Sequence, residues 1–136
     1  MLERDYIRRL IRQFFEEIEK LKDRQKKHTD ASSFQCEIAS MYRAYLGHPV
    51  SFFYEQDAEF ILQTLVSDFP TGQLVQRVEM LADLLYLDAS VPDCSECLQT
   101  DLWKKSLFLY NYVDIHSDIF SFERRSRIAV LKEKIH

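Results

Sequence analysis

The sequence contains very little glycine and proline, with two glycines and three prolines among 136 residues. Tight hairpins and phosphate-binding loops depend on these residues, so their scarcity excludes glycine-rich nucleotide loops and disfavours a fold rich in sheet. The sequence also lacks any uninterrupted apolar run of about 18 residues, so no membrane-spanning helix is predicted. These absences favour helices joined by a small number of turns.

The chain also has few cysteines, and it has no excess of positive charge. Arg4, Asp5 and Arg8 interrupt the apolar residues at the start of the chain, so no export signal is predicted there. The number of cysteines, three, is odd, and together with the lack of an export signal this predicts a protein of the reducing cytoplasm. The formal net charge of −4 disfavours nucleic acid as a partner. With 46% hydrophobic and 29% charged residues, residues 1–136 are expected to form one globular domain that needs neither a disulfide nor a metal.

Apolar residues recur at spacings of three and four along most of the chain, which is typical of one face of an α-helix. The clearest case is a long amphipathic helix predicted over residues 3–24 within segment 1–24, with Ile7, Leu10, Ile11, Phe14, Phe15, Ile18 and Leu21 on its apolar side. Further helices are predicted over 33–46, 58–67, 72–89, 94–117 and 122–135, with a single helical turn over 50–54. The predicted fold class is all-α, with about six helices in antiparallel helix-turn-helix pairs.

Turn and cap residues set the boundaries of these helices. Gly47, with Pro49 two residues later, is a strong stop signal. Asp57 and Ser121 are predicted to be N-caps, because a short polar side chain at that position accepts a hydrogen bond from a free backbone N–H.

The segment 94–117 is the most aromatic part of the chain and has apolar residues on more than one face, so we expect it to be buried from two sides. Its aromatic residues are Trp103, Phe108, Tyr110 and Tyr112. They either belong to the core or line a groove in which tyrosine hydroxyls meet a bound peptide helix or small ligand.

The predicted helix pair over 72–117 has about the size of one tetratricopeptide repeat, which spans about 34 residues. The signature positions of that repeat are poorly kept, and a repeat array needs about three units to bury a continuous core. We therefore expect a tetratricopeptide-like, α-α superhelix-like bundle and not a long solenoid.

Both ends of the chain resemble a family of small bacterial proteins that is catalogued as a domain of unknown function. The resemblance rests on the opening Asp5-Tyr6-Ile7-x-Arg9-x-Ile11-x-Gln13 and the closing Phe120-Ser-Phe-Glu-Arg124 … Ile128 … Leu131. It implies an all-helical fold with a tetratricopeptide-like C-terminal half. It implies no activity, because none is assigned to the family.

Arginines crowd the start of the first helix, where Arg4, Arg8 and Arg12 form one stripe with Arg9 beside it. Cations near a helix N-terminus oppose the helix dipole at roughly 0.3–1 kcal/mol each, so an acidic protein partner or intramolecular carboxylates are expected to compensate. A second basic cluster lies in 122–135, formed by Arg124, Arg125 and Arg127. If the two clusters met on one surface, an anionic ligand would be favoured. The alternative is a solvated face with intramolecular ion pairs.

Cys94 and Cys97 form the one short motif with redox or metal chemistry, a CxxC at a predicted helix start. Asp93 and Glu96 beside them raise thiol pKa values, and no second ligand pair completes a zinc site. His116 lies between Asp114 and Asp118, but spacings of two and four do not converge on a regular helix. No catalytic residue, cofactor or metal site is predicted.

These patterns predict a non-catalytic protein-protein interaction or regulatory module with a protein partner, including a homodimer formed through the N-terminal helix. One alternative is a small-ligand-binding protein or an enzyme whose pocket is lined by the aromatic residues of 94–117. Another alternative is nucleic-acid binding through the arginine stripe.

Overall fold

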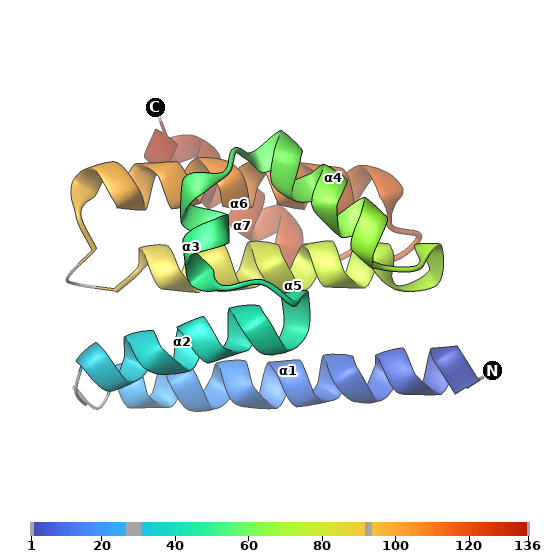
Figure 1. The fold of residues 1–136 in the computed structure, drawn as a ribbon. Helices are drawn as coiled ribbons and strands as arrows, with labels where there is room; N and C mark the ends of the chain where they lie inside the picture. Colours follow the sequence, from blue (N-terminus) through green and yellow to red (C-terminus); the bar gives the residue numbers. More distant parts are fainter. Residues whose placement is uncertain (1, 27–30, 92–93, 136) are drawn as a thin grey trace.

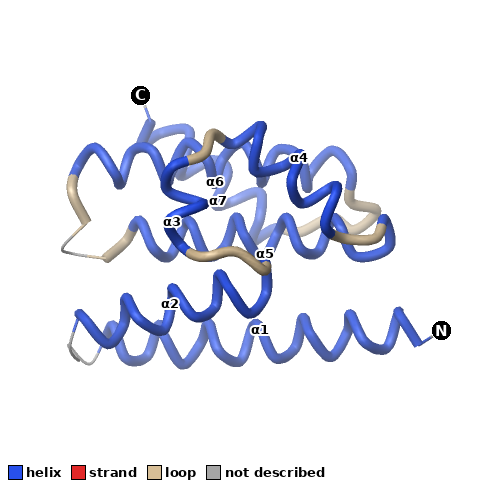
Figure 2. The backbone as a smooth tube through the Cα atoms, in the orientation of Figure 1, coloured by secondary structure: helices blue, strands red, loops and turns tan. Residues whose placement is uncertain are grey.

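The computed structural model describes residues 2–26, 31–91 and 94–135, and these form seven α-helices without a β-strand. The helices are α1 (Leu2–Lys26), α2 (Ala31–Leu46), α3 (Val50–Glu55), α4 (Ala58–Asp68), α5 (Thr71–Ala89), α6 (Glu96–His116) and α7 (Phe122–Ile135). The all-α prediction is confirmed (Figure 2). The single turn predicted over 50–54 is α3, a short helix in its own right.

The predicted boundary signals act as expected. The N–H of Gly47, at φ 80°, donates to a carbonyl one turn earlier in α2 at 3.0 Å. The Asp57 carboxylate accepts a backbone N–H of α4 at 2.8 Å, and the Ser121 hydroxyl accepts one of α7 at 3.2 Å. The helix predicted over 94–117 corresponds to α6, which starts two residues later, at Glu96. It starts there because Ser95 is its N-cap and accepts a backbone N–H at 3.2 Å.

Successive long helices run antiparallel, and α5 lies at the centre of the bundle (Figure 1). The pair α1 and α2 packs on one side of α5 and α6 packs on the other, with α7 against α6, while α3 and α4 cross the face between them (Figure 1). Eleven of the 19 residues of α5 are buried. The segment 94–117 does lie between two neighbours, α5 and α7, but the most enclosed helix is α5. The tetratricopeptide-like character of the α5–α6 pair stays a prediction.

The apolar stripe of α1 is used mainly inside the molecule. Its side chains Ile7, Phe14, Ile18 and Leu21 are buried, and Leu10 and Ile11 pack against the core. Phe14 meets Tyr45 of α2 edge-on, with ring centroids 5.1 Å apart. Phe15 and Tyr6 remain 46% and 47% exposed. The stripe predicted for a homodimer contact is thus largely occupied by the protein's own core.

Candidate functional site

The turn between α6 and α7 exposes four large apolar side chains within eight residues, and we call this group the apolar turn. Ile115 is 78% exposed, Ile119 75%, Phe120 59% and Phe122 83%. Single exposed apolar residues are common on soluble proteins, but a contiguous exposed group marks an interaction site.

Hydrogen bonds fix the backbone of the apolar turn. Ser117 Oγ accepts the N–H of Ile119 at 3.1 Å, and the Arg124 guanidinium donates to the Ile119 carbonyl at 2.7 Å. The rings of Phe120 and Phe122 meet edge-on, with centroids 4.8 Å apart. Since backbone and rings are held in place, the apolar side chains form a preorganised surface.

Sequence reasoning missed the apolar turn, although a signal for it was present. The inward positions of α7 are buried, as Ile128 and Leu131 show, and α6 is already filled by Leu109 and Val113. The four apolar residues around the turn predicted between these two helices therefore had no position on an inward face, which indicates that they are exposed.

The basic cluster of α7 is mostly turned into the bundle. Arg124 is 4% exposed and contacts Glu79 of α5 at 3.0 Å and Asp114 of α6 at 3.4 Å. Arg125 remains 59% exposed, with Asp114 at 3.5 Å. A buried ion pair adds little net stability, because the cost of removing both charges from water offsets their attraction.

Arg127 forms the second link between α7 and α5. Its guanidinium lies 2.6 Å from the Asp83 carboxylate and 2.8 Å from Glu123, while the buried Tyr110 hydroxyl donates to the same oxygen of Asp83. Burial raises the pKa of Asp83 to about 6, although Arg127 and Tyr110 act in the opposite direction. A carboxylate in this position depends on its guanidinium partner to stay ionised.

The arginine stripe of α1 is solvated. Arg4, Arg8, Arg9 and Arg12 are exposed, and none forms an ion pair with a residue in the described part of the chain. In the α7 cluster, Arg124 and Arg127 are turned toward carboxylates of α5, so Arg125 is its exposed member. Binding of an acidic protein or a nucleic acid to the stripe stays a prediction.

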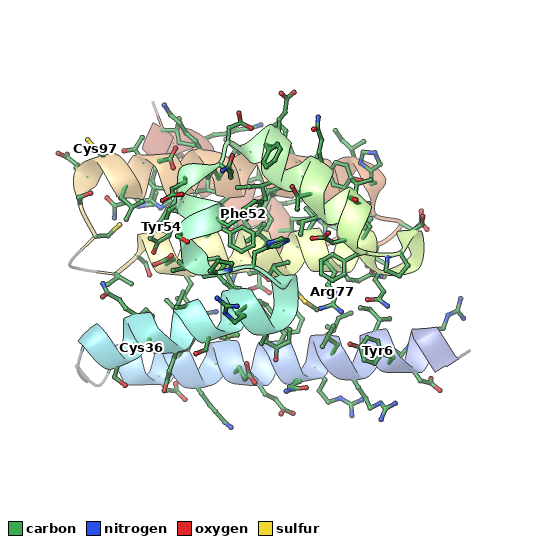
Figure 3. The ribbon with its side chains drawn as sticks, viewed as in Figure 1. Tyr6, Cys36, Phe52, Tyr54, Arg77 and Cys97 are labelled. Atoms are coloured by element: carbon green, nitrogen blue, oxygen red, sulfur yellow. The ribbon has the colours of Figure 1, made fainter. Side chains whose placement is uncertain are left out.

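The cysteines of the CxxC motif lie in unlike surroundings. Cys94 precedes the cap of α6 and is half-buried, and both burial and the nearby Asp88 raise its pKa. Cys97 lies in the first turn of α6 and is exposed. Cys36 on α2 is exposed as well (Figure 3). Asp93, expected to act on the thiols of this motif, lies outside the described residues. Within the described residues, no three His, Cys, Asp or Glu side chains form a metal-binding group.

The aromatic residues of α6 do not share one environment. Tyr110 is buried, Trp103 and Tyr112 are half-buried, and Phe108 is 38% exposed. The expectation that they form a core therefore holds for Tyr110 and only partly for the others.

A cavity of about 460 Å³ lies elsewhere, between α2, α3, the C-terminal end of α5 and the start of α6. Asp88 lines it and is 5% exposed. The Asp88 Oδ2 atom accepts hydrogen bonds from the hydroxyls of Tyr42 at 2.9 Å and Tyr54 at 2.7 Å. Burial raises the pKa of Asp88, and the two hydroxyls act against this. The Tyr42 ring is itself stacked on Phe53, so the Tyr42 hydroxyl is held in place.

Lys105 of α6 is tied to α3, the helix whose Tyr54 lines this cavity. Its buried Nζ donates to the carbonyls of Phe53 and Tyr54, both at 2.9 Å, and lies 2.8 Å from the Asp101 carboxylate. The charge of Lys105 is thus committed to α3 and to its own helix, and sequence reasoning gave no indication of this.

Comparisons with protein-family models, with curated proteins and with solved structures found no match for this chain. The resemblance to a bacterial family of unknown function therefore stays a prediction. No helix among the described residues is both long and apolar enough to cross a membrane.

Proposed function

We propose that the protein is a non-catalytic protein-protein interaction module and that the apolar turn is its docking surface. The observation that carries this proposal is the exposure of Ile115, Ile119, Phe120 and Phe122, which are held on a hydrogen-bonded turn at one end of the bundle (Figure 1). Aromatic side chains such as phenylalanine are enriched in the buried centres of protein interfaces, where they bury large apolar areas.

The occupant that fits the apolar turn is a second copy of the chain. The four side chains of the apolar turn are themselves uncharged, so two copies of a chain with net charge −4 can bury them against each other. Charges of both signs accompany them, since Asp118 is exposed within the turn and the Arg125 guanidinium lies 5.6 Å from the centroid of the Phe120 ring, so opposite charges can meet across a two-fold axis.

The size of the apolar turn predicts a weak dimer. The four side chains expose roughly 500–600 Å² in total, whereas a standard interface buries about 800 Å² on each partner. We therefore expect dissociation constants in roughly the micromolar to millimolar range. The earlier prediction of a homodimer through α1 now rests on Tyr6 and Phe15 alone, because the rest of that stripe is occupied.

Sedimentation velocity from about 1 μM to about 1 mM tests the proposal. The wild-type protein should shift from monomer to dimer, and Phe122→Asp should remain a monomer. This variant should fold normally, because Phe122 is 83% exposed and an acidic residue in the first turn of a helix is favourable.

Phe15→Asp is the matched control, since it places the same charge on the half-exposed position of α1. It should dimerise like the wild type. Dimerisation that is lost in Phe15→Asp and kept in Phe122→Asp would move the contact to α1. A wild-type protein that is monomeric at every concentration would overturn self-association.

A further inference from the structure

Asp88 is an unusual buried charge in this fold. Of the two buried carboxylates among the described residues, Asp83 has the guanidinium of Arg127 at 2.6 Å. Asp88 has no cationic partner in that part of the chain, and its Oδ1 atom accepts no hydrogen bond from a described residue. Buried carboxylates are normally paired or neutralised, because removing an ion from water is costly.

The cavity beside Asp88 offers space and a mixed lining for the missing partner. Its volume of about 460 Å³ lies within the range of small-molecule sites, roughly 300–1,000 Å³. Gln35, Tyr54 and Ser95 add polar side chains to the lining, and Ile38, Val91 and Leu98 add apolar ones that we call the apolar wall. Lys105, the buried lysine of α6, is held by Asp101 and by two carbonyls of α3.

We propose that this cavity binds a small organic amine, whose ammonium group donates to Asp88 Oδ1 and whose aliphatic body packs against the apolar wall. One carboxylate among neutral groups does not provide the six or more oxygen ligands that Ca²⁺ prefers. Because the two tyrosine hydroxyls already occupy Oδ2, one oxygen is left for a single donor. The site therefore favours a primary ammonium over a guanidinium, which binds best when both carboxylate oxygens are free.

A titration of the ¹⁵N-labelled full chain at pH 7.5 with n-butylammonium tests the proposal by NMR. The backbone signals of Gln35, Tyr54 and Ser95 should shift with a saturable dose dependence. The neutral isostere n-butanol should bind at least about tenfold more weakly, and so should n-butylguanidinium. Equal binding of n-butanol and n-butylammonium, or no saturable shift at these residues, would overturn the proposal.

Two variants test the site from opposite sides. Asp88→Asn removes the charge and keeps an oxygen that can accept from Tyr42 and Tyr54, so it should fold and bind n-butylammonium at least about tenfold more weakly. Ala39→Leu keeps the carboxylate but fills the cavity from α2, so it should also lose binding. Glu55→Gln, an exposed carboxylate at the end of α3, is the matched control and should bind like the wild type. Wild-type affinity in both cavity variants would refute the assignment of the site.

Discussion

Replacing Arg127 by methionine should expose the energetic dependence of Asp83 on its guanidinium partner. The substitution keeps an unbranched side chain but leaves the buried carboxylate with the Tyr110 hydroxyl alone. Removing one partner of a buried ion pair costs about 3–5 kcal/mol, because the remaining charge is uncompensated. We expect a loss of this size in the free energy of unfolding at pH 7.5, measured by urea denaturation.

The pKa of Asp83 sets the pH dependence of this loss. Its pKa is raised from 3.8 to about 6 in the folded protein, so the folded state binds a proton more readily than the unfolded chain. This group therefore contributes stability that is fully present below pH 3.8 and is lost as the pH rises through about 6, at a total of about 3 kcal/mol. Arg127 lowers this pKa, so the Asp83 carboxyl of the Arg127→Met variant should be protonated at pH 5. No buried charge is then left unpaired, and the loss of stability caused by Arg127→Met at pH 5 should be only roughly 1–2 kcal/mol.

The double variant Arg127→Met with Asp83→Asn separates charge from packing. Because no unpaired charge remains, it should recover most of the stability that Arg127→Met loses at pH 7.5. If the double variant is as unstable as Arg127→Met at both pH values, the loss comes from packing and the electrostatic reasoning is refuted.

Three further predictions concern other positions. Lys105→Met should lower the free energy of unfolding by about 2–4 kcal/mol in urea denaturation, because it leaves two carbonyls of α3 without their donor; a change below about 0.5 kcal/mol would contradict this role. Gly47→Ala should cost about 1 kcal/mol in the same assay, because φ is 80° there and no atom lies near an added Cβ, so strain alone acts; an unchanged midpoint would count against it. In labelling with a disulfide reagent at pH 7.5, Cys94 should react more slowly than Cys36 and Cys97, because burial and Asp88 raise its thiol pKa; a fast-reacting Cys94 would revive the redox interpretation.

Much of the fold could be predicted from the sequence because its signals are local. The period of Ile7, Phe14 and Ile18 and the caps at Gly47 and Asp57 depend only on neighbouring residues. Such patterns specify where a helix lies and which of its faces is apolar, whatever the rest of the chain does.

The polar interior could not be predicted because its partners are far apart in the sequence. Arg124 and Glu79 are 45 residues apart, and Tyr42 and Asp88 are 46 residues apart. The sequence shows that Arg124 belongs to a basic cluster, but only the packing of α7 on the bundle turns its side chain inward. The unpaired oxygen of Asp88 depends on three helices at once, and no local pattern indicates it.

The enclosure of α5 has a consequence for how the bundle opens. Local fluctuations expose a helix to solvent only where part of its surface is already free, whereas α5 is covered by α1, α2, α4 and α6. Its amide hydrogens, such as that of Leu84, should therefore exchange with deuterium only when the whole domain unfolds. The same helix carries Asp83 near its middle and Asp88 near its end, so occupation of the cavity should slow exchange along all of α5 and not at its end alone.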